Sequence, residues 1–121
     1  MSSAIDRVIA ELDAFTGEEV VALNLECAAE LKLACRVDTG WARNNFQSTI
    51  GAPAPAEAAM SDAQAIRVLA GYTIEQGPTY VSNRVRYVGL QGKGRGALTI
   101  DEASEAVARA LANRTAAGAK P

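Results

Sequence analysis

The sequence predicts an α+β fold in which long N-terminal helices and a C-terminal helix pack on a small, mainly antiparallel sheet. Apolar residues recur at three-and-four spacing near both ends of the chain, which indicates amphipathic helices. Residues 43–51 instead alternate apolar and polar side chains, and residues 79–83 form a second run typical of a strand. The 121 residues suffice for one domain with a single core. Within it we expect an N-terminal helix (1–15), a core (16–115) and a flexible tail (116–121).

The first predicted helix ends where Thr16 and Gly17 interrupt the apolar pattern. Its apolar face comprises Ile5, Val8, Ile9, Leu12 and Phe15. Because Thr16 and Glu19 have the spacing of a capping box, we expect a second helix to begin there and to end near Arg36.

The second predicted helix carries two apolar strips on opposite sides. The broader strip comprises Val20, Leu23, Cys27, Leu31, Ala34 and Cys35. The narrower strip comprises Ala22, Leu25, Ala29 and Leu33, flanked by Glu19, Glu26, Glu30 and Lys32. A surface helix of a monomer needs only one apolar strip. The narrower strip therefore predicts either a helix enclosed within its own chain or, as we favour for so small a domain, a face that contacts a neighbouring subunit.

Trp41, the only tryptophan, follows a turn at residues 37–40. Tryptophan is enriched at subunit interfaces, so Trp41 is a candidate interface residue. Its position equally suits a core residue that seals the turn against the second helix, and we prefer this second interpretation.

The middle of the chain predicts short elements joined by turns. The strand at 43–51 would carry on one face Phe46, Ser48 and Ile50. Residues 53–55, Pro-Ala-Pro, would form a flexible or extended connector. Ser61 and Gln64 have capping-box spacing, which predicts a third helix with the apolar residues Ala65, Ile66, Val68 and Leu69.

The last part of the chain predicts a strand, a loop and a helix. After the strand at 79–83, residues 85–90 would continue as a strand or an irregular extension. Residues 92–96, Gly-Lys-Gly-Arg-Gly, have the composition of a flexible loop. Thr99 and Glu102 form another capping box, followed by a stripe that we expect to be buried, namely Ala103, Val107, Ala110 and Leu111.

The charge of the chain is nearly balanced overall but uneven along its length. The formal net charge of -2 is too close to neutral for a protein that wraps nucleic acid with its whole surface. Residues 1–36 contain seven acidic and three basic side chains, whereas residues 37–98 contain four acidic and six basic ones. This asymmetry suits head-to-tail contacts between copies, and an ordinary solvated surface explains it equally well.

The two cysteines, Cys27 and Cys35, are expected in one helix, roughly 12 Å apart at about 1.5 Å per residue. That separation is too large for a disulfide, so we expect reduced core thiols in a cytosolic protein. We expect neither a signal peptide nor a membrane span.

Two segments invite a catalytic or ligand-binding interpretation. Asp38-Thr39-Gly40 matches the signature of aspartic proteases, but those proteins are almost wholly β, and here the motif follows a helix and precedes Trp41. The loop at 92–96 lacks the spacing of a phosphate-binding loop, so it would be a basic loop that orders on a partner or on DNA, or a plain solvent loop. The chain has no histidine. We therefore expect no catalytic, cofactor-binding or metal site.

Two segments together resemble a known protein family. Val37-Asp38-Thr39-Gly40-Trp41-Ala42-Arg43-Asn44-Asn45-Phe46 resembles the V-D-T-G-x-x-R-x-S-[FW] stretch that follows the long helix in neck and tail-completion proteins of long-tailed bacteriophages. Tyr80-Val81-Ser82-Asn83-Arg84-Val85-Arg86-Tyr87-Val88-Gly89-Leu90-Gln91-Gly92 is similar to their [IV]-x-N-x-x-x-Y-A-x-x-L-E-x-G stretch. The order of the predicted elements between residues 17 and 112 agrees with that family.

The resemblance implies a structural virion protein, assembled in the host cytoplasm, that forms a ring of itself at the neck between head and tail. It would be a tail-completion, tail-terminator or head-tail joining protein, forming a hexamer or dodecamer. Its partners would be the head-closure or connector proteins and the tail-tube proteins, with DNA only as passing cargo and no membrane contact. Candidate contacts to these partners or to the DNA channel are Arg84, Arg86, Lys93 and Arg95. The alternatives are a small aspartic protease and a cytosolic adaptor or nucleic-acid-binding module that uses these basic residues.

Overall fold

A computed structural model describes residues 4–35, 41–85 and 98–116, with the side chains of residues 11–15 left outside the description. The elements in chain order are α1 (Ala4–Ala34), α2 (Trp41–Asn44), β1 (Gln47–Ile50), α3 (Asp62–Leu69), the 3₁₀ helix η1 (Ile74–Gln76), β2 (Thr79–Ser82) and α4 (Ile100–Ala116).

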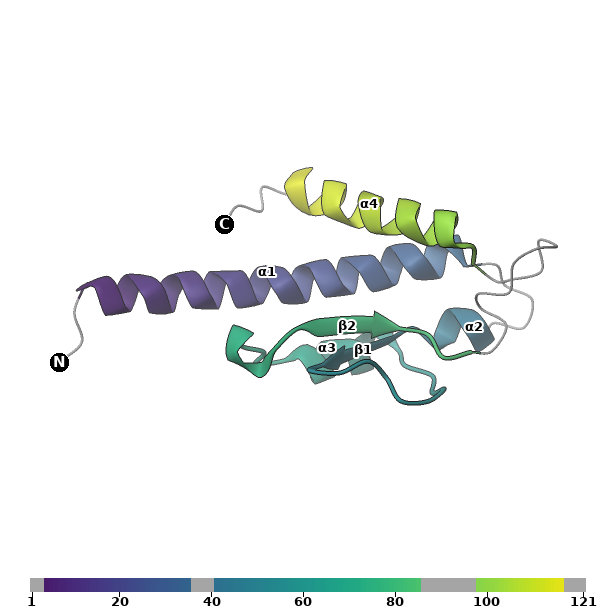
Figure 1. The fold of residues 1–121 in the computed structure, drawn as a ribbon, viewed down its shortest axis with the longest axis horizontal. Helices are drawn as coiled ribbons and strands as arrows, with labels where there is room; N and C mark the ends of the chain where they lie inside the picture. Colours follow the sequence, from purple (N-terminus) through teal and green to yellow (C-terminus); the bar gives the residue numbers. More distant parts are fainter. Residues whose placement is uncertain (1–3, 36–40, 86–97, 117–121) are drawn as a thin grey trace.

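Helix α1 forms the middle of the molecule, between α4 on one side and the sheet on the other (Figure 1). Helix α3 lies beside strand β1. Strands β1 and β2 pair in antiparallel orientation, with Ser48 opposite Val81 and Thr49 opposite Tyr80. The predicted α+β fold, with helices packed on a small antiparallel sheet, is confirmed.

The predicted interruption at Thr16 and Gly17 is wrong, because α1 is one continuous helix of 31 residues. Gly17 is buried, and a Cβ atom placed on it would lie 3.3 Å from the backbone carbonyl oxygen of Tyr72. The glycine therefore permits a close approach between α1 and the loop before η1 and does not end a helix. Glu19 caps nothing; its carboxylate instead accepts a hydrogen bond at 3.1 Å from Arg114 of α4.

Strand β1 is shorter than predicted and is preceded by a short helix, α2, at Trp41–Asn44. Asn45 terminates this helix by donating its Nδ2 to the carbonyl oxygen of Trp41 at 2.9 Å. The predicted alternation holds at Ser48, whose Oγ donates to Oδ1 of Asn24 in α1 at 2.7 Å. Gln47 points to the other side and donates to the carbonyl oxygen of Ala56 at 2.7 Å. Helix α1 therefore covers one face of the sheet and the loop at 52–60 covers part of the other.

The Pro-Ala-Pro connector, predicted to be flexible or extended, packs against the end of β2. Ala54 is fully buried. Its amide donates to Oγ of Ser82 at 3.3 Å, and its carbonyl oxygen accepts from Nε of Arg84 at 2.7 Å.

The capping boxes predicted for α3 and α4 are both present. Ser61 and Gln64 cap α3 reciprocally, and Thr99 and Glu102 do the same for α4. The predicted buried stripe of α4 is only partly right. Ala106 and Ala110 are fully buried, whereas Val107 and Leu111 are 39% and 50% exposed. Ala106 and Ala110 face α1, and their small side chains allow the two helices to approach closely.

The core lies where the C-terminal end of α1 meets α2, the sheet and the start of α4. Its buried members are Leu31, Cys35, Ala42, Phe46, Val85, Leu98 and Ala106.

Candidate assembly surfaces

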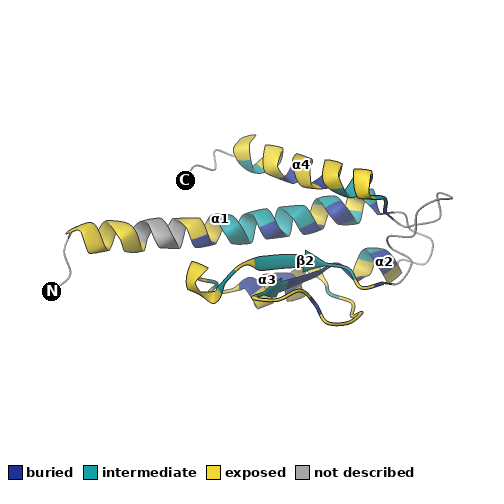
Figure 2. Cartoon of the chain, in the orientation of Figure 1, coloured by how far each residue is buried: buried dark blue, intermediate teal, exposed yellow. Residues whose placement is uncertain are grey.

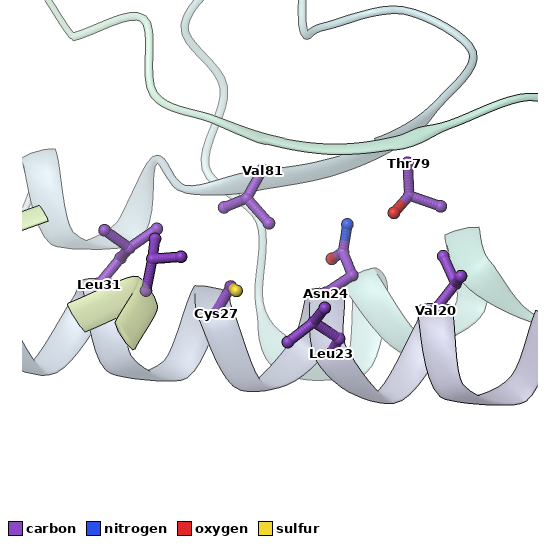
Figure 3. A pocket seen from close by; sticks show the side chains of 8 residues that line it. Val20, Leu23, Asn24, Cys27, Leu31, Thr79 and Val81 are labelled. Carbon is purple, nitrogen blue, oxygen red and sulfur yellow. The ribbon is translucent and has the colours of Figure 1, made fainter. Parts of the chain in front are cut away.

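An apolar groove runs along α1 between β2 and α4 and has a volume of about 280 Å³. It is lined by Val20, Leu23, Asn24, Cys27, Leu31, Thr79, Val81 and Val107. Figure 3 shows Thr79 and Val81 pointing from β2 toward the side chains of α1. Most of the broader apolar strip predicted for α1 therefore faces this groove, and its C-terminal end, at Leu31 and Cys35, is buried in the core.

One buried polar side chain fixes β2 over the groove. Asn24 is 5% exposed, and its Nδ2 donates to the carbonyl oxygen of Tyr80 at 3.1 Å. Its Oδ1 accepts from Ser48 Oγ. A single amide thus connects α1 to both strands, which satisfies its polar atoms in an otherwise apolar setting. The apolar spacing of this side of the helix gave no signal for Asn24, because its role depends on Ser48 and Tyr80, which are far away in the sequence.

The other side of the groove is set by ion pairs between α1 and α4. Arg114 lies 3.1 Å from the carboxylate of Glu19, and Arg109 lies 3.5 Å from that of Glu30. Asn113 adds longer contacts to Glu26 and Glu30, at 3.4 and 3.5 Å. The sequence places these glutamates beside the narrower strip. In the fold they contact α4, so part of the acidic charge of residues 1–36 is matched within the chain.

The edge of α4 next to the groove is apolar and exposed. Val107 lines the groove. Around the axis of α4, the side chains of Ile100 and Leu111 leave the helix within about 40° of the direction of Val107. Ile100 is 75% exposed and Leu111 is 50% exposed. One copy of the chain therefore leaves an apolar stripe of α4 uncovered.

Cys27 lines the groove and Cys35 lies in the core, and the two cysteines are not joined by a disulfide. Burial raises the pKa of the Cys27 thiol, and the neighbouring Glu26 carboxylate adds to this effect. The prediction of two core thiols is thus right for Cys35 and only partly right for Cys27, which is half-buried.

The N-terminal part of α1 extends past the sheet and past the end of α4 (Figure 1). We call residues 4–15 the arm. Ile5, Val8 and Ile9 are 71%, 53% and 52% exposed, and Figure 2 shows this end of the helix as exposed. The apolar face predicted here exists, but in one copy nothing among the described residues covers its described side chains.

The narrower strip of α1, which we call the outward strip, points away from the groove. Leu33 is 72% exposed and Ala29 is also exposed, whereas Ala22 and Leu25 are half-buried. One predicted explanation of this strip was a helix enclosed within its own chain, and the other was a face that contacts a neighbouring subunit. The exposure of Leu33 contradicts the first explanation at this position.

Trp41 does not occupy the core, so the preferred interpretation of this residue is wrong. Its side chain is 42% exposed, and its Nε1 donates to Oε1 of Glu57 at 2.6 Å. Ala42 and Phe46 fill the core at this point. The indole thus lies at the surface, where the interface interpretation would place it.

The structure describes one of the four basic candidates. Arg84 is exposed, and its Nε donates to the Ala54 carbonyl oxygen. Arg86, Lys93 and Arg95 lie outside the described residues, as does Asp38-Thr39-Gly40.

The two segments that carry the family resemblance meet in the fold. Asn83 donates its Nδ2 to the carbonyl oxygen of Ala42 at 2.7 Å and accepts the amide of Val85 at 3.0 Å. Arg43 donates to the carbonyl oxygen of Cys35 at 3.1 Å, which connects the first segment to the end of α1. The described parts of both segments therefore act as scaffold.

Within the described ranges, no three His, Cys, Asp or Glu side chains come together as a metal ion would require. None of the helices in these ranges combines the length and apolar character needed to span a membrane. Helices predominate in the same ranges, unlike the almost wholly β fold on which the protease hypothesis depends.

Comparisons with protein-family models, with curated proteins and with solved structures found no match to this chain.

Proposed function

We propose that this chain is a structural subunit that assembles into a ring at the neck of a long-tailed bacteriophage, where it completes the tail or joins it to the head. The ring would contain six or twelve copies and contact the head-closure and tail-tube proteins. DNA would pass through it as cargo.

The observation that carries this proposal is the apolar surface that one copy leaves uncovered on α1. The outward strip ends in Leu33, which is 72% exposed, and Trp41 lies exposed beyond the end of the same helix. Large apolar surfaces on a soluble chain typically mark contacts with other proteins. When such a contact joins unlike patches of successive copies and the rotation closes, the product is a ring.

The family resemblance supplies the place of that ring. The contact between Asn83 and Ala42 gives both segments one structural purpose, which is to hold the end of α1, α2 and β2 together. That the two segments contact each other supports treating them as parts of one motif.

The first test is self-association of the purified full chain. Native mass spectrometry and negative-stain electron microscopy should show closed rings of six or twelve copies. Leu33→Asp places a charge on the outward strip and should reduce the ring population at least tenfold. Ile66→Asp is the matched control, because Ile66 is 55% exposed on α3, away from the strip, and its replacement should leave ring formation unchanged.

The second test addresses the partners. Head-closure and tail-tube proteins encoded beside this chain should bind it in pull-down experiments and promote ring formation. A chain that remains monomeric both alone and in the presence of these two proteins, and binds neither, would contradict the proposed function, because a neck subunit must assemble at least when its partners are present.

A further inference from the structure

Two apolar features of one copy lack a covering partner among the described residues, and both lie along one side of α1. The first is the groove beside β2 and α4, and the second is the arm. Ile9 and Cys27 are 18 positions apart, which is about five full helical turns, so their side chains leave α1 in the same direction. Ile9, and Ile5 within about 40° of it, therefore continue the surface that lines the groove, whereas Val8, 18 positions before Glu26, continues the adjoining side that faces α4.

The arm and the groove also match in length. Residues 4–15 and residues 20–31 each cover twelve positions of α1, or about 18 Å of helix. If two copies face each other with their α1 helices antiparallel, each arm lies opposite the other copy's groove. Ile9 of one copy then lies across from Cys27 of the other, and Ile5 across from Leu31.

We propose that the arm of one copy occupies the groove of a second copy, in a reciprocal exchange between two antiparallel α1 helices. This proposal rests on the self-association part of the proposed function and on no other part of it. Such an exchange is a helix-in-groove contact, in which residues at i, i+3 and i+4 anchor an amphipathic helix. Ile5, Val8 and Ile9 have that spacing.

The available apolar surface agrees with a stable pair. Each copy contributes six large apolar side chains that are more than a third exposed beside this surface, namely Ile5, Val8, Ile9, Ile100, Val107 and Leu111. A standard interface needs about 800 Å² from each partner. These side chains, present twice in a reciprocal pair and joined by the half-buried lining of the groove, supply a large part of that area.

The exchange leaves the outward strip free. Ala29 and Leu33 point to the opposite side of α1 from Cys27, so ring contacts through the strip and pair contacts through the arm can coexist. The pair is isologous, whereas the ring contact is head-to-tail. An assembly that uses both contains an even number of copies, as two stacked rings of six would.

A disulfide between Ile9→Cys and the native Cys27 tests the exchange directly. Within one chain these positions are about 27 Å apart along a rigid helix, far beyond disulfide reach. Any link between them must therefore join two copies. We expect oxidation of the full-length Ile9→Cys variant to give a covalent dimer, with peptide mass spectrometry identifying the 9–27 bond. Because the exchange is reciprocal, complete oxidation should stop at the dimer.

The matched control moves the groove cysteine to the opposite side of the helix. In Ile9→Cys/Cys27→Ser/Ala29→Cys the second thiol is two positions away, exposed, and directed about 160° from the groove, so no 9–29 bond should form. Val107→Asp, which charges the wall of the groove, should lower the yield of the 9–27 dimer at least tenfold while the circular dichroism spectrum stays unchanged.

Other outcomes would overturn the exchange. A predominant 9–9 bond would mean that arms pair only with each other. A bond from Ile9→Cys to Ile66→Cys would place the arm in the separate groove near Gly17, Val21 and Tyr72. If rings form while the 9–27 bond is absent, arm exchange is wrong and the proposed function stands. If the 9–27 dimer forms but neck proteins are not bound, arm exchange is right and the proposed place in the phage neck is wrong.

Discussion

The two halves of α1 carry the same kind of apolar pattern but have different surroundings. In the C-terminal half, Leu31 is 8% exposed and Cys35, just beyond the helix, is 1% exposed. In the arm, Ile5 is 71% exposed and Ile9 is 52% exposed. Figure 2 shows the change along one continuous helix, from an exposed N-terminal end to a largely covered C-terminal end.

The difference arises from the ends of neighbouring elements and not from α1 itself. Arg114, near the end of α4, pairs with Glu19, so the described part of α4 covers α1 only from about that residue onward. Contacts with the sheet reach Asn24 through Tyr80. Amphipathic spacing thus shows which face of a helix will bind apolar surface, but the partner must be supplied by other parts of the chain or by another chain.

The largest expected effect is a contrast between equivalent truncations in the two halves. Leu31→Ala should lower the free energy of unfolding by about 2–5 kcal/mol, because it leaves a cavity in the core. Ile9→Ala should change it by no more than about 0.5 kcal/mol, because its side chain has few contacts within one copy. Urea denaturation of dilute protein, kept monomeric, measures both.

The same pair of variants can sharpen the contrast at higher concentration. If arms are covered by a second copy, the effect of Ile9→Ala should grow with protein concentration, because association stabilises the folded state by mass action. Equal losses for the two variants in dilute solution would break the comparison and mean that the arm is buried within its own chain.

A second, intermediate effect concerns the hydrogen bonds of Asn24, which hold the sheet on the C-terminal half of α1. Asn24→Ala should lower the free energy of unfolding by about 1–3 kcal/mol, because buried Ser48 Oγ and the Tyr80 carbonyl oxygen each lose a hydrogen bond. The control is Asn44→Ala, at an exposed position of α2, which should have almost no effect. A loss no larger than that of the control would show that apolar packing alone holds β2 on α1.

The sequence was sufficient for the parts of the fold that depend on local chemistry. The capping boxes at Ser61 and Thr99 need only neighbouring residues, and both were predicted. Gly17 and Glu19 were misinterpreted because their roles depend on Tyr72 and Arg114, which are far away in the sequence. Local spacing offers no signal for such contacts.

The candidate surfaces divide in the same way, into features that local spacing predicts and features that depend on residues far away in the sequence. The direction of the outward strip could be predicted because it depends only on helical geometry. Leu33 is exposed while Ala22 and Leu25 are half-buried, and contact of the strip with a neighbouring subunit stays a prediction. The arm and the exposed edge of α4 were missed as surfaces. Their apolar spacing was recognised, but that spacing gave no indication that α4 begins and ends where it does or that Ala106 and Ala110, not Val107 and Leu111, face α1.

A smaller effect is expected at the boundary between the two halves. A double-mutant cycle with Glu19→Gln and Arg114→Gln should give a coupling energy of about 0.2–1 kcal/mol, because both side chains are partly exposed to water. High salt should reduce it through screening. A coupling that is absent at low salt would mean that the apolar contacts of α4 set the end of the covered region without help from this ion pair.

The smallest effect should appear as a pH dependence of the covered half, through Cys27. Burial raises the pKa of this thiol in the folded chain, so its contribution to stability is complete below the ordinary value of 9.0 and is lost as the pH rises through the folded-state pKa. Between about pH 8 and about pH 10, wild-type protein should therefore lose more unfolding free energy than Cys27→Ala. Equal losses would contradict the raised pKa. Occupation of the groove by an arm should bury the thiol further, so concentrated protein should react with iodoacetamide at Cys27 more slowly than dilute protein at the same alkaline pH.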